Sequence, residues 1–402
     1  MKVKKLNLSL PRIRKGKATK KAATGFDQAK WIRGFSIAAI GIWVFYSFVV
    51  DFLPYEVASF FQKWMPATTV NEALVWVICA LGLNIVVGYA GLLDLGFVAF
   101  WAIGGYVAGW LMSDFFQQVS IHIGSTAPAE QRGIHISFWG VLIIGGLVAA
   151  VFGVIIGAPT LRLKSDYLAL VTLGFGEIIP QIFYNGENIG GFNLTNGSKG
   201  IAPVDNVGLF GKTLGPFDLD WKYLIFVSLT ALMVFISLRI RSGRLGRAWL
   251  AIREDELAAS MMGVPLMRSK LSAYAIGAVS GGVGGVAFAT HVNGVFADRF
   301  SFSISIILLA MVVLGGMGNV WGVIVGALAI AWVNATGLPA FGDTVNSLLG
   351  TKINFPSYNF LLFGGILIFM MLYKREGFLP ESRLKELLHE TDDETSNTGK
   401  HV

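Results

Sequence analysis

Apolar segments long enough to cross a lipid bilayer recur along almost the whole chain. A helix rises 1.5 Å per residue, so crossing about 30 Å of hydrocarbon takes roughly 20 apolar residues. Segments close to this length lie at Gly34–Val50, Val70–Gly88, Ala90–Met112, Ile136–Gly157, Tyr167–Tyr184, Trp221–Ile240, Leu271–His291 and Ser357–Tyr373. The chain is therefore predicted to be an all-α, polytopic membrane protein.

Two shorter apolar segments, Ile304–Leu314 and Trp321–Val333, flank the glycine-rich stretch Gly315–Asn319. If both cross the bilayer, the segments add up to ten crossings; if they form a re-entrant hairpin, eight crossings and the hairpin remain. The prediction is thus about 8–10 transmembrane helices, some of them broken or re-entrant.

Composition supports a membrane protein and gives no reason to expect a nucleic-acid partner. Of the 402 residues, 54% are hydrophobic and 14% are charged, whereas a soluble chain carries about 25% charged residues. The net charge of +7 comes from cations at the ends of apolar segments rather than on one basic face. The positive charge is therefore interpreted as a signal of membrane topology.

Cysteine and histidine give no sign of a metal centre. Cys79 is the single cysteine and lies within an apolar segment, so no disulfide framework or cysteine-based metal site is expected. The histidines are scattered without the spacing of metal ligands; they are His122, His135, His291, His389 and His401. Neither a metal nor a cofactor of its own is expected for this chain.

Lysine and arginine predict which ends of the helices face the cytoplasm, because cytoplasmic loops are enriched in them. With the N-terminus inside, 25 of the 32 Lys and Arg residues lie on the inner side. We therefore expect both termini in the cytoplasm and an uncleaved first span. The expected division is a basic arm at 1–33, a membrane domain at 34–373 and a largely disordered tail at 374–402.

Residues 241–270 form the one long polar interruption between apolar segments, and we call them the polar loop. Placing a cation in hydrocarbon costs roughly 2.5–3.5 kcal/mol on insertion scales, so this basic stretch is expected to face water in the cytoplasm. Apolar residues recur within it at helical spacing, which predicts an amphipathic helix over Leu245–Met262. The residues of the apolar side are Trp249, Ile252, Ala259 and Met262.

Gly263 and Pro265 are expected to end this helix, glycine as a C-terminal cap and proline because it cannot continue the hydrogen-bond ladder. Two interpretations stay open from the pattern alone. The helix either docks into a groove of a partner protein or is a solvated surface helix that joins two spans.

The stretch 82–96 brings two apolar segments together with almost no polar loop between them. Its glycines weaken a helix by roughly 1 kcal/mol each relative to alanine, so the helix is predicted to open here. Freed backbone groups in a membrane are tolerated only where they line a cavity or are buried in protein. The candidate substrate-pathway residues are Asn84, Tyr89, Gly91 and Asp94, together with Gly315 and Gly316 of the glycine-rich stretch. The alternative is a cytoplasmic turn that Asn84 and Asp94 merely flank.

Glu177 lies near the middle of the apolar segment Tyr167–Tyr184. An acid at that depth is a candidate functional residue because it must be paired or hydrated. Glu177 therefore joins the candidate substrate pathway. The alternative is a structural hydrogen bond between helices, or a protonated buried glutamic acid.

Four ordered motifs resemble the LivM-type permeases of branched-chain amino-acid importers. They are GLNIVVGYAGLLDLGFVAFWAIGGY (82–106), TLRLKSDYLALVTLGFGEIIP (160–180), GRAWLAIREDELAASMMGV (246–264) and MVVLGGMGNVWGVIVGA (311–327). The resemblance covers most of the chain between residues 80 and 330. It implies a subunit of an ABC importer in the bacterial inner membrane that moves branched-chain, hydrophobic amino acids.

Within the polar loop, Glu256-Leu257-Ala258-Ala259 followed by Gly263 resembles the EAA loop through which such permeases contact their ATPase. The resemblance therefore implies ATPase-coupling residues at Gly246, Arg247, Ala251, Arg253, Glu254, Glu256, Ala258, Ala259 and Gly263. The partners it implies are a homologous second permease of the LivH type, two ATPase subunits and a soluble substrate-binding protein.

Energy is expected to come from those partners. The chain contains no GxxxxGK[ST] phosphate-binding loop, so ATP is expected to be bound by the partner subunits and the chain is not expected to be an enzyme. A urea or amide permease of the same class is the nearest alternative function. An ion-coupled secondary transporter is the rival from another class, but it would need inverted repeats and paired ions within the membrane.

Overall fold

The computed structural model describes residues 28–379 except 129, 164, 210–211, 351 and 375–376. The chain divides into two units, residues 1–41 and 42–402. The first contributes the beginning of helix α1, and all packing described below lies within the second. Most of the expected basic arm and tail lie outside the described residues. The cytoplasmic location of the termini stays a prediction.

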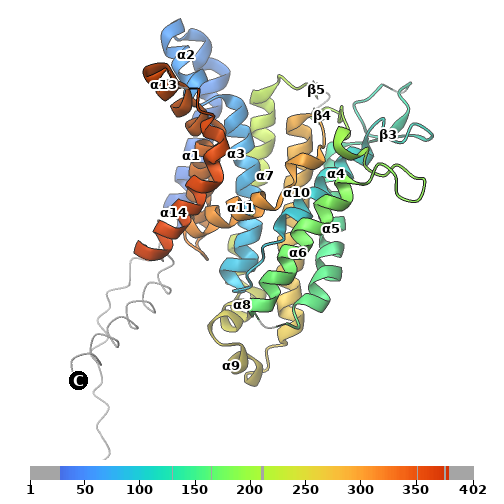
Figure 1. Cartoon of the computed structure of the whole chain (residues 1–402), viewed down its shortest axis with the longest axis vertical. Helices are drawn as coiled ribbons and strands as arrows, with labels where there is room; N and C mark the ends of the chain where they lie inside the picture. The colour runs from blue at the N-terminus through green and yellow to red at the C-terminus, as the bar shows by residue number, and fades with distance from the viewer. Residues whose placement is uncertain are drawn as a thin grey trace, which may run out of the picture. The chain divides into compact units, whose positions relative to one another are not determined.

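Helices form most of the described chain, as expected from the apolar segments (Figure 1). The α-helices are α1 (Gln28–Val44), α2 (Tyr55–Trp64), α3 (Ala67–Leu83), α4 (Phe97–Leu111), α5 (Phe138–Thr160), α6 (Ser165–Tyr184), α7 (Leu219–Ser242), α8 (Arg244–Glu254), α9 (Glu256–Met261), α10 (Leu266–Val292), α11 (Phe302–Gly315), α12 (Val320–Trp332), α13 (Leu338–Leu349) and α14 (Asn359–Tyr373).

Short π- and 3₁₀-helical turns extend or connect these helices. The π-helical turns are η1 (Phe45–Val49), η3 (Asn84–Tyr89) and η6 (Val333–Gly337). The 3₁₀ turns are η2 (Val50–Phe52), η4 (Gly197–Lys199), η5 (Ala297–Arg299) and η7 (Phe355–Tyr358). With such turns counted as helix, nine described helices are long and apolar enough to cross a membrane. The prediction of a polytopic, all-α membrane protein is confirmed.

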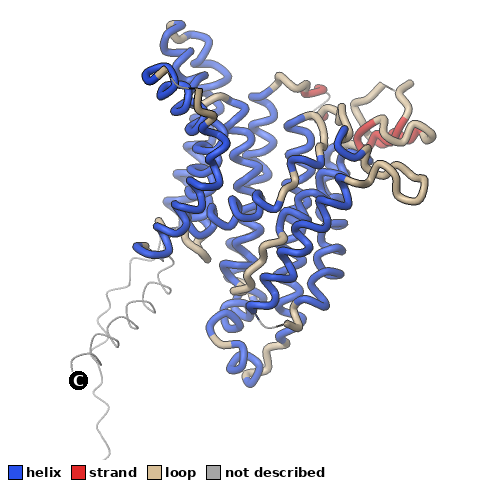
Figure 2. The backbone as a smooth tube through the Cα atoms, viewed as in Figure 1, coloured by secondary structure: helices blue, strands red, loops and turns tan. Residues whose placement is uncertain are grey.

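The strands are short and belong to loops at one end of the bundle (Figure 2). They are β1 (Met112–Ser113), β2 (Ser120–Ile123), β3 (Gly133–Ile136), β4 (Val207–Leu209) and β5 (Lys212–Leu214). Strand β3 pairs with β1 in antiparallel and with β2 in parallel orientation, and β4 pairs with β5. We call this end of the bundle the strand end, and the opposite end, where α8 and α9 lie, the loop end.

The β2–β3 pairing brings together two histidines that are scattered in the sequence. The imidazole rings of His122 and His135 stack with their centroids 4.8 Å apart. The buried His135 donates from Nδ1 to Asp205 Oδ2 at 2.8 Å. Burial raises the pKa of Asp205 and this hydrogen bond opposes the rise. These contacts tie the loop after α4 to the loop before α7.

Helix α10 lies at the centre of the bundle and packs against α3, α4 and α5. Glycines permit the close approach, as expected between helices in a membrane. A Cβ added at Gly282 of α10 would lie 2.5 Å from the Gly145 carbonyl oxygen of α5, and one added at Gly285 would lie 2.6 Å from the Gly105 nitrogen of α4. The backbones of these helices therefore touch with no side chain between them.

The predicted span Ala90–Met112 is not one continuous helix. Helix α3 continues through the π-helical turn η3 to Tyr89, and residues 90–96 are not helical. Gly91 adopts a left-handed φ of +68°, which a residue with a side chain rarely adopts. Helix α4 then has only 15 residues, about 22 Å at 1.5 Å per residue. We call residues 90–96 the helix break.

Helices α11 and α12 pack against each other as a hairpin about residues 316–319. Helix α11 has 14 residues, about 21 Å, which is shorter than the bilayer core. Helix α12 continues through η6 into α13, so that residues 320–349 form one long helical segment. We call residues 316–319 the hairpin turn.

The predicted single helix over Leu245–Met262 is wrong. Helix α8 ends at Glu254, and Asp255 is extended, with φ −155° and ψ 111°. The Asp255 carboxylate accepts a hydrogen bond from the Ala258 nitrogen at 2.9 Å and so begins the separate helix α9. As a result Met262 does not join Trp249 on the buried side but is 85% exposed.

Substitution of Gly285 by valine should destabilise the protein, because its side chain would overlap the carbonyl oxygen of Trp101. Overpacking of this kind costs about 1–3 kcal/mol. The measurement is the thermal transition of the purified protein in detergent. Gly365→Val in α14 is the matched control, because no atom lies within 4 Å of a Cβ there. An equal change in both variants would contradict the proposed packing.

Candidate functional site

The helix break exposes backbone N–H groups inside the bundle, and side chains from other helices bind them. Asp94 Oδ1 accepts from the Gly96 nitrogen at 2.9 Å. Thr172 Oγ1 of α6 accepts from the Leu95 nitrogen at 3.1 Å, and Ser305 Oγ of α11 accepts from the Val98 nitrogen at 3.0 Å. The positive N-terminal end of α4 is thus held within the protein by oxygen atoms of three different segments.

Asp94 is the buried acid of this site. Its side chain is 1% exposed, and Tyr274 of α10 donates its hydroxyl to Asp94 Oδ1 at 3.5 Å. The second carboxylate oxygen, Oδ2, has no hydrogen-bond partner among the described residues. Asp94 therefore caps α4 from inside the chain and keeps one free acceptor.

The helix break and the hairpin turn are joined through Asn84. The Asn84 side chain is fully buried, and its Oδ1 accepts a hydrogen bond from the Gly318 nitrogen at 2.8 Å. A Cβ added at Gly88 would lie 2.6 Å from the same Gly318 nitrogen. Two interruptions that lie more than 200 residues apart in sequence therefore meet at one place.

The described end of the chain covers the hairpin turn. The nitrogen of Phe378 donates to the carbonyl of Leu314 at 2.8 Å, and that of Leu379 to the carbonyl of Gly315 at 3.1 Å. Gly316 has a φ of +111° and lies against Gly377. The candidate residues Gly315 and Gly316 thus have their backbone bound by residues 377–379.

The last two turns of α7 hold the loop end of the helix that continues from α3 to Tyr89. Tyr89 is buried, and its hydroxyl lies 3.1 Å from Ser237 Oγ of α7. The guanidinium of Arg241 lies 6.0 Å from the centroid of the Tyr89 ring, a distance at which a cation is attracted to an aromatic face. Both partners come from the last two turns of α7, directly before α8.

Arg253 connects α8 directly to the helix break. Its Nη1 donates a hydrogen bond to the carbonyl of Gly88. A Cβ added at Gly91 would lie 2.8 Å from Arg253 Cγ and 3.4 Å from its Cα, so the backbone of α8 passes close to the backbone of the break. A rigid-body movement of α8 must therefore displace Gly88 and Gly91 or break this contact.

The remaining loop residues divide into buried anchors and an exposed surface. Gly246 and Ala259 are buried, Trp249 Nε1 donates to the Ser269 carbonyl at 2.8 Å, and Lys270 pairs with Glu256 at 2.6 Å. Gly263 ends α9 with a φ of +83°, as predicted. The exposed surface includes Arg247, Glu254, Leu257, Ala258, Met261 and Met262. Ala251 is half-buried.

Glu177 lies apart from this site. It is exposed on α6, whereas the preceding residue, Gly176, faces inward, and a Cβ there would lie 3.1 Å from Gly96 Cα. Glu177 and the helix break therefore lie on different sides of the same helix. The two acids predicted for the substrate pathway, Asp94 and Glu177, are not one cluster.

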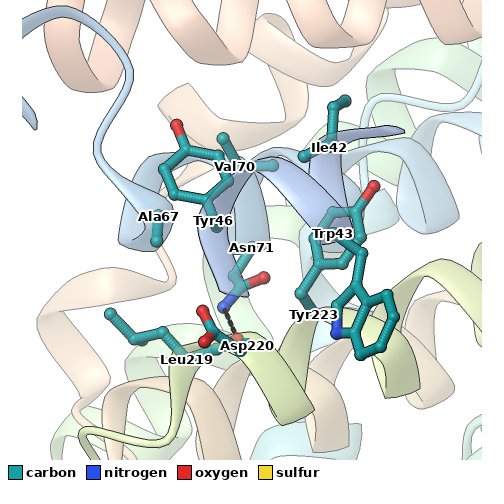
Figure 3. A pocket seen from close by; sticks show the side chains of 9 residues that line it. All are labelled: Ile42, Trp43, Tyr46, Ala67, Val70, Asn71, Leu219, Asp220 and Tyr223. Carbon is teal, nitrogen blue, oxygen red and sulfur yellow. Dashed lines mark hydrogen bonds between the residues drawn. The ribbon is translucent and has the colours of Figure 1, made fainter. Parts of the chain in front are cut away.

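A narrow pocket lies at the strand end between α3, α7 and residues 42–46 (Figure 3). Asn71 donates from Nδ2 to the Leu219 carbonyl at 3.0 Å at its floor. Its volume of about 10 Å³ leaves room for a single water molecule at most. This pocket is too small to bind an amino acid.

The structure thus brings together most of the predicted pathway with part of the predicted coupling loop. Asn84, Tyr89, Gly91 and Asp94 lie in or beside the break, and Arg253 reaches it. Sequence reasoning missed the residues that bind the break from other helices, namely Thr172, Ser237, Tyr274 and Ser305. Their only signal in the sequence is that each is a polar residue within an apolar segment.

Comparison with known proteins gives one consistent result. The family described as "Branched-chain amino acid transport system / permease component" matches residues 65–371. The chain is 34% identical over 331 residues to the high-affinity branched-chain amino acid transport system permease protein LivM of Escherichia coli K12, covering 77% of this chain and 69% of that protein. No solved structure matches.

More distant similarities extend to an archaeon and to a second type of permease. The probable branched-chain amino acid transport permease protein LivM of Methanocaldococcus jannaschii is 27% identical, with 79% of this chain and 95% of that protein covered. The permease protein LivH of Escherichia coli K12 is 24% identical, with 69% of this chain and 85% of that protein covered.

Replacing Asn84 by alanine should loosen the junction between the helix break and the hairpin turn. The buried Gly318 nitrogen would lose its acceptor, at a cost of about 1–3 kcal/mol. The expected results are a lower thermal transition and faster amide exchange at residues 316–319. Asn185→Ala, an exposed residue at the end of α6, is the control and should change neither. Unchanged exchange in Asn84→Ala would contradict the junction.

Proposed function

Because the chain belongs to the family of branched-chain amino acid transport system permease components, we propose that it carries branched-chain amino acids across the inner membrane as one subunit of an ATP-driven importer. The observation that carries this proposal is the contact between Arg253 of the polar loop and the Gly88 carbonyl at the helix break. That contact supports direct mechanical coupling between the polar loop, whose water-exposed surface can bind a partner protein, and the helix break within the membrane.

The partners follow from the relatives and from the chain's own surfaces. LivM-type and LivH-type relatives are both described as permeases of branched-chain amino acid transport systems, which supports pairing with a second permease chain. The apolar side chains of Leu257, Met261 and Met262 are 68%, 78% and 85% exposed at the tip of the polar loop. Such exposed apolar side chains suit burial against an ATPase subunit on the cytoplasmic side. A soluble binding protein would deliver substrate on the other side.

The proposed mechanism couples movement of α8 and α9 to the helix break. An ATPase that shifts the polar loop pulls on Gly88 through Arg253, and on Tyr89 through Arg241 and Ser237. Because α3 is joined to the hairpin turn through Asn84, the two interruptions move together. The helix break has few regular backbone hydrogen bonds, so it deforms more easily than the helices around it when α8 and α9 move.

The substrate requires a polar route. Burying the unpaired carboxylate and ammonium of an amino acid in hydrocarbon costs many kcal/mol. The helix break concentrates polar groups inside the bundle, including the free acceptor Asp94 Oδ2 and the free donor Asn84 Nδ2. Asp94 acts in this proposal as a positioning residue, since it is 1% exposed and bound to Gly96 and Tyr274.

The proposed function is tested by uptake of radiolabelled leucine in cells that lack this chain and receive it from a plasmid. Uptake should depend on the chain and on a functional ATPase subunit, should persist when the proton gradient is abolished with ATP maintained, and should be reduced by excess valine but not by urea. Competition by urea would identify the amide permease instead. Uptake that follows the proton gradient and ignores the ATPase would identify a secondary transporter.

Substitution of Arg253 by alanine should lower leucine uptake by about tenfold or more, because a charge-assisted hydrogen bond contributes about 1.5–3 kcal/mol and 1.4 kcal/mol corresponds to tenfold. ATP hydrolysis by the assembled complex should continue, so the ratio of transport to hydrolysis falls. Arg253→Lys should retain part of the uptake, since the lysine ammonium can also donate to the carbonyl.

Arg268→Ala is the matched control, because Arg268 is an exposed cation of the same loop and its loss removes the same charge. It should leave both uptake and hydrolysis unchanged. The coupling role of Arg253 is wrong if Arg253→Ala transports normally, or if it abolishes ATP hydrolysis as completely as it abolishes transport.

A further inference from the structure

Helix α6 has two distinct faces along its whole membrane span. Leu168, Thr172, Gly176 and Phe183 are buried and turn towards the rest of the chain. The opposite face repeats at three and four residues, as one side of a helix does; it comprises Tyr167, Leu170, Gly174, Glu177, Ile178 and Gln181. Tyr167 is 61% and Leu170 66% exposed, and nothing lies within 4 Å of a Cβ added at Gly174. We call this side the outer face of α6.

Glu177 places a carboxylate on this face near the middle of the membrane. It lies ten residues after Tyr167 and seven before Tyr184 in a span of 18 residues, about 15 Å from one end at 1.5 Å per residue. Gln181, one turn further, is also exposed. No described residue forms a hydrogen bond or ion pair with Glu177 within the chain.

The outer faces of two other spans are different. The exposed large side chains of α5 are apolar throughout, with Ile143, Leu147 and Ile155 each about 60% exposed. Those of α14 are also apolar or aromatic, with Leu361 75% and Leu372 68% exposed. These two surfaces suit contact with lipid. On α6, by contrast, the charged side chain of Glu177 is exposed near the middle of the span.

A carboxylate facing lipid at this depth would cost roughly 2.5–3.5 kcal/mol on insertion scales. We propose that Glu177, on the outer face of α6, is the group that attracts the ammonium of the substrate, in a water-filled passage between this chain and the second permease of the proposed function. This inference rests on the proposed function, because it names the surface and the partner through which that function operates.

A second permease chain fits this face for two reasons. Relatives of both the LivM and the LivH type are permeases of the same kind of system, so a membrane partner of comparable length is available to cover a full span. The open space at Gly174 permits close approach of a neighbouring helix. At Glu177 and Gln181, by contrast, the partner must leave room for water or supply polar groups.

The position of Glu177 also connects the passage to the helix break. Gly176 contacts Gly96, and Thr172 binds the Leu95 nitrogen, both on the inner side of α6. A displacement of the break therefore pushes on α6 directly behind Glu177. The coupling path from Arg253 thus reaches the passage wall without needing the substrate to enter the buried break itself.

The first test is cysteine labelling in membranes that contain the complete transporter. The only native cysteine, Cys79, is buried, so it provides a low background. Single cysteines are introduced as Glu177→Cys, Gln181→Cys and, as the lipid-facing control, Leu147→Cys. The reagent is a charged, membrane-impermeant methanethiosulfonate, which reacts with thiolates in water.

Cysteines at positions 177 and 181 should react at least about tenfold faster than one at position 147, because a thiol in lipid ionises less readily and each unit of raised pKa lowers its thiolate fraction tenfold. Equal, slow reaction at all three positions would show that the outer face of α6 is buried in lipid or dry protein and would overturn the proposal.

The second test examines the charge of Glu177 through a cysteine at position 181. A cationic methanethiosulfonate should react faster than an anionic one. Glu177→Gln should lower this ratio of rates about sevenfold, since unit charges about 6 Å apart in water interact by roughly RT, which attracts the cation and repels the anion. An unchanged preference in Glu177→Gln would show that the carboxylate does not act in the passage.

The third test identifies the chain across the passage. A bifunctional maleimide is applied to Gly174→Cys in the purified complex, with cysteines introduced along the co-expressed second permease, and the product is identified by mass spectrometry. A product with the second permease supports the proposal, and a product with another copy of this chain contradicts it. Leucine uptake by the same variants distinguishes the proposed passage from the proposed function. Normal uptake without labelling or cross-linking would overturn the passage on the outer face of α6 but would leave the proposed function in place.

Discussion

A helix that opens inside an apolar bundle must find hydrogen-bond partners for its free backbone groups within the protein, and this constraint organises the structure. At residues 90–96 the partners come from Asp94 itself and from Thr172 on α6, and in the first turn of α4 the partner is Ser305 on α11. The Gly88 carbonyl is bound by Arg253 of α8. Because each partner lies on a different element, the break holds the position of the surrounding helices relative to one another, and their movement acts on the break.

The same constraint explains how a surface loop reaches the interior. A cation within a membrane protein must be paired or hydrated, and Arg253 satisfies this requirement by donating to a carbonyl that the end of α3 leaves free. The arrangement serves both groups, since the guanidinium gains an acceptor and the carbonyl gains a donor. The proposed transport cycle uses this mutual dependence: a shift of α8 and α9 changes the partner of Gly88, and the hairpin turn follows through Asn84.

The sequence predicted the elements better than their interruptions. Apolar length sufficed to predict the helical membrane fold, and the glycines near Asp94 predicted an opening. The sequence did not reveal that α3 continues as a π-helix to Tyr89, because Asn84 and Gly88 are stabilised there by Gly318, far away in the chain. Asp255 likewise split one predicted helix into two through a local cap. Nor did hydropathy reveal that Asp94 is buried and Glu177 exposed, since that depends on which side of each helix is covered.

In the proposed mechanism, nucleotide-driven movement reaches the helix break through Arg253. Hydrogen–deuterium exchange of residues 84–97 in the complete transporter, with and without a non-hydrolysable ATP analogue, measures it most directly. We expect the nucleotide to change the exchange of this segment in the native complex and to have no effect on it in Arg253→Ala, although the ATPase still binds nucleotide. The same nucleotide-dependent change in both proteins would show that the movement does not pass through Arg253.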